Sequence, residues 1–515
     1  MICLSKPITH FTPFTARKPI KCFLPSHLHP PNGPNPSSSN EERYHTHLCE
    51  THSLKPFVPP SQMPDPGLFS SKKSGDGGEG RGSRIWASCG FGFWVQGFRC
   101  FPWLALNFHM AHGLGLSPSA LQLVQNAGNL PMVAKPLFGL ISDAVYIAGA
   151  QRLPYISIGA FLQALSWGTL ALIPTHIGTF SVQMTCILLS NTGASITEVA
   201  NDALVAVFGK TQKASGLQSY AFTALAAGAL LGNMLGGFFL LKFSEPKTMF
   251  FIFSILLSIQ LVFSLKTKEE SLLEGKETSL YRPKVSNHRQ NSLKENLVRQ
   301  FNDLITIISD KKILYPLLWI VASNAVVPLF SGSIFCFQTE CLKLDPLVIG
   351  LSKVVGQLMV LFITLAFNLY LKNIPMRKLV FWLQISYALS FLSDLILVKQ
   401  YNVRLGLPNG AYVLCLSSLA ESIAQFKTLP FTILFSRLCP SGSESSLFAF
   451  FASALCLSSI LSGILGVGLA SFLGVSSGEY SGLHLGIMVQ SLAALLPLSW
   501  ISYVPTRRNL EMKKA

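Results

Sequence analysis

Apolar segments long enough to cross a membrane recur along most of this chain. A spanning helix needs about 20 residues, and runs of that length alternate with short polar breaks from Phe91 to Val504. Only 12% of the 515 residues are charged, whereas soluble domains carry about 25%. We therefore expect an all-α polytopic membrane protein. Twelve helices are predicted, at residues 91–114, 118–142, 153–174, 179–208, 214–241, 247–265, 313–338, 346–371, 376–398, 409–436, 446–474 and 482–504.

A charged segment divides these helices into two sets of six. Between Lys266 and Lys312 the chain holds ten Lys or Arg and seven Asp or Glu. Six helices, a charged loop and six more helices is the plan of a two-bundle transporter. The predicted parts are a disordered leader (1–84), an N-terminal six-helix bundle (85–265), a charged central loop (266–312), a C-terminal six-helix bundle (313–504) and a basic tail (505–515).

The leader has the composition of an organelle transit peptide. Its first 40 residues include Lys6, Arg17, Lys18 and Lys21 and no acidic residue, and they lack the apolar core of a secretory signal. The alternative is a disordered cytosolic tail. Basic residues favour the tails and the central loop, so both termini are expected on the cytosol-equivalent side. That side is the stroma if the protein lies in the chloroplast inner envelope.

Several other classes of protein are not supported. The net charge of +16 resides in the tails and central loop instead of along one amphipathic face, which argues against nucleic-acid binding. The 11 cysteines lack metal-ligand spacing, and the chain has no phosphate-binding loop or nucleophile elbow. We therefore expect neither an enzyme nor an ATP-driven pump, and no metal or cofactor. The expected partners are the lipid bilayer and a small-molecule substrate. The protein is expected to be a monomer.

Two carboxylates share one face inside the fourth predicted helix. Glu198 and Asp202 lie four residues apart, and an ionised carboxylate at bilayer depth costs about 2.5 to 3.5 kcal/mol on insertion scales. They are therefore candidates for a substrate or coupling site. The alternative is that they neutralise a neighbouring helix or lie near the aqueous edge.

An internal repeat suggests partners for these carboxylates. Asp143 and Arg152 lie nine residues apart, as do Asn368 and Arg377, so the halves register at an offset of 225. The offset places Lys427 opposite Asp202, Arg99 opposite Asn324, and Glu421 near the counterpart of Glu198.

The remaining charges receive provisional roles. If the fourth and tenth helices face each other, Asp202 and Lys427 are predicted to form a salt bridge, with Glu421 a less favoured competitor. Arg99, like Lys427, is a candidate for binding an anion. Lys135 is interpreted mainly as a snorkelling side chain near a helix end.

Four strings at the expected helices resemble the folate-biopterin transporter family of the major facilitator superfamily, in particular its plant chloroplast branch. They are VQGFRCFPW from Val95, QLVQNAGNLPMVAKPLFGLISD from Gln122, TEVANDALVA from Thr197 and RLCPSGSESSLFAFFAS from Arg437. The resemblance implies twelve helices in two bundles and secondary transport of folates or pterins by alternating access, with a proton as one candidate coupling ion.

The resemblance also implies roles for individual residues. Gly139, Asp143 and Arg152 match the superfamily's loop signature and are assigned to gating. Asp202 or Glu198 could bind the donor edge of a pterin, while Arg99, Lys135 or Lys427 could hold the glutamyl carboxylates. Val207 and Phe208 stand where the family pattern often has an acidic residue. Carriers of another organic anion or solute, and a receptor or scaffold with the same fold, therefore remain alternatives.

Overall fold

The computed structural model describes residues 79–147, 150–174, 179–211, 217–243, 245–267, 291–371, 374–438 and 444–505. The predicted leader lies outside these residues except for its last six positions, as do residues 268–290 of the central loop and the tail beyond residue 505. The described part is almost entirely helical, so the prediction of an all-α polytopic protein is confirmed.

The first half contains six predicted spans, two of which are broken. The first consists of α1 (Glu79–Phe98), α2 (Cys100–Phe108) and a π-helix, η1 (His109–Gly113). The second consists of α3 (Pro118–Gly128), α4 (Leu130–Val133) and α5 (Lys135–Ala144). The other four are single helices: α6 (Leu153–Leu172), α7 (Phe180–Thr211), α8 (Leu217–Phe243) and α9 (Pro246–Lys266).

The second half also contains six predicted spans, and they follow a linker helix, α11 (Asn291–Ser309). The seventh span of the chain is divided into three elements, α12 (Lys311–Ala325), α13 (Ser331–Cys336) and η3 (Phe337–Cys341). The tenth is divided into four, α17 (Asn409–Tyr412), η5 (Val413–Ser417), α18 (Ser418–Phe426) and α19 (Leu429–Leu438). The remaining elements are α14 (Pro346–Ala366), η4 (Phe367–Leu371), α15 (Met376–Val398), α16 (Tyr401–Arg404), α20 (Glu444–Phe472), α21 (Leu483–Ala493) and η6 (Leu496–Tyr503).

Seven helices of the described chain are long and apolar enough to cross a membrane. They correspond to the third, fifth, sixth, eighth, ninth, eleventh and twelfth predicted spans. The other five carry Arg99, Lys135, Glu198 with Asp202, Asn324 and Lys427. Four of these are broken into shorter helices, and the fourth span has two carboxylates in one 32-residue helix. The spans that fail as apolar helices are therefore those that hold the candidate site.

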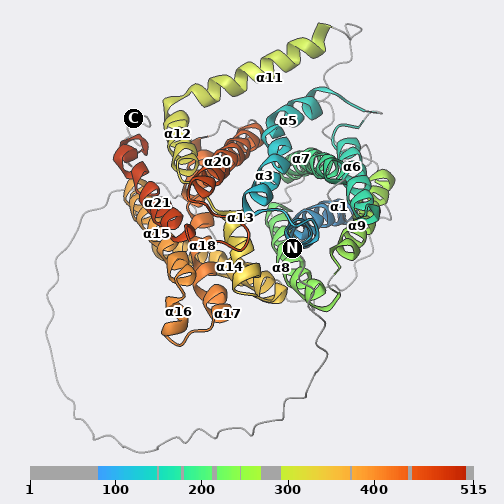
Figure 1. The fold of residues 1–515 in the computed structure, drawn as a ribbon. Coiled ribbons are helices and arrows are strands. Elements are labelled where there is room, and N and C mark those ends of the chain that lie inside the picture. Colours follow the sequence, from blue (N-terminus) through green and yellow to red (C-terminus); the bar gives the residue numbers. More distant parts are fainter. Residues whose placement is uncertain are drawn as a thin grey trace, which may run out of the picture. The chain divides into compact units, whose positions relative to one another are not determined.

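Each half packs mainly against itself. In the first, α6 packs against α7 and α9, and α1 against α8; in the second, α12 packs against α20, α14 against α18 and α15 against α21 (Figure 1). Phe101, Trp167 and Phe253 are fully buried in the largest apolar cluster. Aromatic side chains therefore fill the space that the helices enclose.

The two halves meet along two seams. One joins α8 to α14, where a Cβ added to Gly237 would come within 2.9 Å of the Leu347 Cα. The other joins α3, α4 and α5 to α20. Ser453 of α20 donates to the Val133 carbonyl at 2.5 Å in this second seam.

Gly466 of α20 should tolerate no side chain. A Cβ there would lie 1.7 Å from the Leu329 carbonyl oxygen, in the break between α12 and α13. Gly466→Ala is expected to lower the free energy of unfolding by about 1 to 3 kcal/mol, because backbone must shift to admit the methyl group. Thermal unfolding of the detergent-solubilised chain measures this. The control is Gly468→Ala in the same helix, where nothing lies within 4 Å of the added Cβ; equal losses in both variants would contradict the prediction.

Candidate functional site

Glu198 is the centre of a buried charge cluster in the first half. Its carboxylate accepts a hydrogen bond from Arg99, between α1 and α2, and another from the Lys135 Nζ at 2.6 Å. All three side chains are less than a fifth exposed. Three spans that are distant in sequence are thus joined through one carboxylate, and the cluster carries a net charge of +1.

Asparagine 191 fixes the position of Arg99 within this cluster. The guanidinium donates to the Asn191 Oδ1 at 3.2 Å, and the Asn191 amide donates to the Gly128 carbonyl at 2.5 Å. That carbonyl is at the end of α3, just before the break that precedes Lys135. The interruption of the second span therefore supplies both a free carbonyl and the lysine.

Asp202 lies one turn beyond Glu198 in α7 and is exposed. Among the described residues it has no hydrogen-bond or ion-pair partner, so the predicted salt bridge with Lys427 is not formed. The interpretation of Lys135 as a snorkelling side chain is also wrong, because its ammonium pairs with Glu198.

Lys427 is buried in the second half without a carboxylate partner in the described part of the chain. It lies between α18 and α19, is 2% exposed, and donates to the Asn324 Oδ1 at 3.0 Å and the Ser323 carbonyl at 3.4 Å. Its ammonium lies 4.6 Å from the centroid of the Tyr387 ring and 5.8 Å from that of Trp319. An amide and two aromatic faces surround this ammonium group, and no carboxylate of the described chain pairs with it.

The contact between first and fourth spans is repeated between the seventh and tenth with the polarity reversed. In the first half the cation, Arg99, bonds to Glu198; in the second, Asn324 bonds to the cation, Lys427. The offset of 225 correctly pairs Arg99 with Asn324. It places the counterpart of Glu198 at residue 423, one helical turn from Lys427.

Glu421 belongs to a different contact from Lys427. It pairs with Lys353 of α14 at 2.5 Å, and both side chains are more than a third exposed. One turn along the same two helices, Gln357 of α14 donates to Gln425 of α18 at 3.4 Å. Sequence reasoning missed Lys353, and it also missed Asp394 of α15, which interacts electrostatically with Lys353 and Glu421. Both are charged residues inside predicted spans, the criterion that identified Asp202.

The three residues assigned to gating lie together near the end of α5. Arg152 bonds to Asp143 and donates to the Ser142 Oγ at 2.7 Å. Gly139 is not required for close helix approach, because an added Cβ would meet only Val199, at an ordinary 3.5 Å. The repeat is imperfect here, since Arg377 donates to the Ser502 and Val504 carbonyls.

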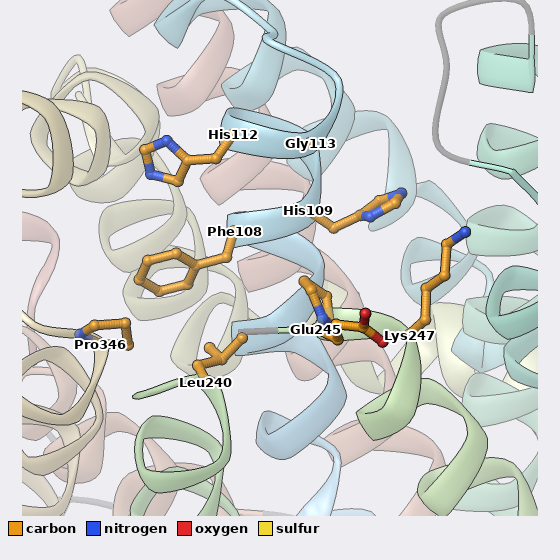
Figure 2. Close-up of a pocket in the computed structure, with 9 residues that line it drawn as sticks. Phe108, His109, His112, Gly113, Leu240, Glu245, Lys247 and Pro346 are labelled. Carbon is orange, nitrogen blue, oxygen red and sulfur yellow. The ribbon is translucent and has the colours of Figure 1, made fainter. Parts of the chain in front are cut away.

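A pocket of about 630 Å³ lies apart from these charges. Figure 2 shows Phe108 and His112 projecting from one side of the end of the first span and His109 from the other. The Nε2 of His109 is hydrogen-bonded to the Gln183 Oε1 at 3.2 Å. Lys247 and Pro346 also line the pocket, which includes none of the predicted site residues. No potential metal-ligand cluster of three His, Cys, Asp or Glu occurs within the described ranges.

Comparison with known proteins places this arrangement among membrane transporters. The BT1 family matches residues 96–515. The chain is 54% identical over 417 residues to the probable folate-biopterin transporter 9, chloroplastic, of Arabidopsis thaliana, covering 81% of this chain and 76% of that protein. It is 28% identical to the folate-biopterin transporter of Synechocystis, covering 80% of each.

Solved structures support the fold independently. The nucleoside transporter NupG superposes with a TM-score of 0.56 at 12% identity, over 82% of this chain and 98% of that one. A D-xylose–proton symporter gives a TM-score of 0.57 at 14% identity, over 82% and 98%. The resemblance inferred from the four sequence strings is therefore confirmed at the level of family and fold.

Proposed function

Because the chain belongs to the BT1 family, we propose that it carries folates or pterins across a plastid membrane by alternating access. The names of its relatives in Arabidopsis thaliana and Synechocystis support this substrate class, and those of the Arabidopsis relatives support this location. The chain is a carrier and not an enzyme in this proposal, and it works as a monomer.

The observation that carries the proposal is the presence of basic side chains inside the spans of both halves. Arg99 and Lys135 share one carboxylate, and Lys427 has none. A folate has an anionic glutamyl tail and a pterin ring whose amino and ring N–H groups form a donor edge. The uncompensated Lys427 would attract a tail carboxylate, and Arg99 offers the planar donor fork that a carboxylate matches.

Asp202 supplies the complementary chemistry for the ring. Its carboxylate is exposed and has no partner among the described residues, so it can accept hydrogen bonds from the donor edge of a pterin or accept a proton. We assign coupling to Asp202 in preference to Glu198, because two basic side chains already occupy the oxygens of the Glu198 carboxylate. Glu421 and its partner Lys353 form a secondary candidate.

Uptake by the purified chain in liposomes tests the substrate class. Labelled folate and a simple pterin should show saturable uptake, each competing with the other, and an unrelated dicarboxylate should compete poorly. A folded protein that transports neither would overturn the substrate assignment and favour another organic anion or a non-transporting role.

We further propose that residues 1–84 are a transit peptide and that the destination is the inner envelope. The relatives named as chloroplastic and the acid-free start of the chain support this. The two bundles would then be residues 85–265 and 313–504. The loop between them (266–312) and the tail (505–515) would lie in the stroma. A reporter fused to residues 1–84 should enter isolated chloroplasts and become protease-protected; exclusion from the organelle would count against the assignment.

A further inference from the structure

The seventh span is unwound between α12 and α13, at residues 326–330. Unwound backbone is tolerated at membrane depth only where its polar groups are satisfied or line a cavity. Ser462 of α20 satisfies part of it: the Ser462 hydroxyl donates to the Val327 carbonyl, and the Leu329 N–H donates to the Ser462 carbonyl at 3.1 Å. These bonds lie within the second half of the chain.

Gln122 completes this hydrogen bonding from the other half. It lies in α3, is 1% exposed, and its Nε2 donates to the Leu329 carbonyl at 2.5 Å and to the Gly463 carbonyl at 2.7 Å. Its Oε1 accepts from the Gly332 N–H at 3.1 Å. The side-chain amide of Gln122 therefore donates both of its hydrogens to, and accepts one hydrogen bond from, backbone groups of the opposite half.

Further contacts between the two halves surround Gln122. The rings of Phe108 and Phe335 meet edge to face across the same boundary, with centroids 5.1 Å apart. Ser331 donates to the Gln125 Oε1 at 3.2 Å, and a Cβ on Gly332 would lie 2.5 Å from the Pro118 carbonyl oxygen. These contacts bring the two halves together on either side of Gln122.

The contacts around Gln122 lie at the opposite end of the bundle from Asp202. Gly128 faces Ile187 and Lys135 pairs with Glu198, so the second span runs parallel to α7. Gln122 precedes Lys135 by thirteen residues, or roughly 20 Å of helix. Asp202 lies beyond Glu198 in the other direction and is exposed. The contacts made by Gln122, Phe108 and Ser331 thus join the halves at the end of the bundle where Phe108 and Pro346 line the pocket of Figure 2.

We propose that Gln122 is a clasp that holds this end of the transport pathway closed by binding the unwound backbone of the seventh span. The inference rests on the alternating-access part of the proposed function. Gln122 is a positioning residue: it acts through the backbone at Leu329, Gly332 and Gly463. Each bond is exchanged for one with water when the halves part, so the net stabilisation per bond is small enough to be reversible.

Spin-label distances across the closed end test the clasp without any substrate. One label is placed on Lys242→Cys, in the last turn of α8, and the other on the native Cys341, both exposed, after the other reactive cysteines are replaced by serine. In nanodiscs, Gln122→Met should raise the population of the longer distance roughly tenfold, as expected for the loss of about one net hydrogen bond or more.

The matched control is Gln163→Met. Gln163 is 3% exposed and donates to Gly159 and Thr197, so its bonds lie within the first half. Its replacement should leave the distance distribution unchanged. Identical distributions for Gln122→Met and the parent would overturn the proposal. If Gln122→Met fails to fold, Gln122→Asn is used, because it retains the amide but is too short for these contacts. Failure of folate uptake alone would leave this result standing, so the two proposals are tested separately.

Discussion

Replacing Lys427 by methionine is expected to lower folate uptake at least roughly 30-fold while leaving the protein as stable as the parent. Removing one partner of a buried charged contact typically costs 2 kcal/mol or more of binding, about a 30-fold loss. Stability should not fall, because a buried cation with no carboxylate partner is itself unfavourable and methionine fills a similar volume. The measurement pairs uptake kinetics in liposomes with thermal unfolding in detergent.

This combination separates a substrate role from a structural one. If Lys427 only held Asn324 and the rings of Tyr387 and Trp319 in place, Lys427→Met would lower the unfolding temperature and uptake together. Lys353→Met is the control for stability, because Lys353 is a second lysine within a span but its pair with Glu421 is partly exposed. Exposed pairs contribute about 0 to 1 kcal/mol, so this change should have little effect on stability. Uptake that survives Lys427→Met would remove Lys427 from the site.

Replacing Glu198 by glutamine is expected to destabilise the fold by about 3 to 5 kcal/mol and to abolish uptake. The change keeps the side-chain volume but leaves Arg99 and Lys135 as buried cations without a counter-charge, which is the costly way to break a buried ion pair. Denaturant titration in mixed micelles and liposome uptake measure the two effects.

Two further variants make this prediction specific. Asp202→Asn is the same chemical change one turn along α7, where the side chain is exposed and has no partner in the described structure, so stability should be retained while uptake falls. Lys135→Met combined with Glu198→Gln removes one of the uncompensated cations and should recover part of the lost stability. A Glu198→Gln protein as stable as the parent would show that the cluster is not a structural unit.

Most helix positions follow from the sequence because they depend on local properties. The length and apolarity of residues 376–398, for example, predict the helix that α15 forms, since a bilayer span needs about 20 apolar residues whatever surrounds it. Hydropathy also identified Glu198 and Asp202 as exceptional. The same rule, applied to every span, would have added Lys353 and Asp394.

The pairing of the charges could not be predicted in this way. Glu198 and Asp202 share a helix face, yet one is held by two cations and the other is exposed, because the rotation and depth of α7 relative to α1 and α5 decide which carboxylate they reach. The Lys427 side chain contacts Asn324 in its own half and not Asp202 in the other half. Its ammonium lies there against the rings of Tyr387 and Trp319.

Sequence alone therefore determined the all-helical membrane class and the family of this protein, since these depend on hydropathy and on contiguous strings of residues. Only the tertiary structure decided that Glu198 joins Arg99 to Lys135, that Lys427 lacks a carboxylate partner in the described chain, and that Gln122 binds the unwound backbone of the opposite half. These contacts join residues up to 341 positions apart. Their geometry comes from the packing of whole helices, which no local pattern encodes.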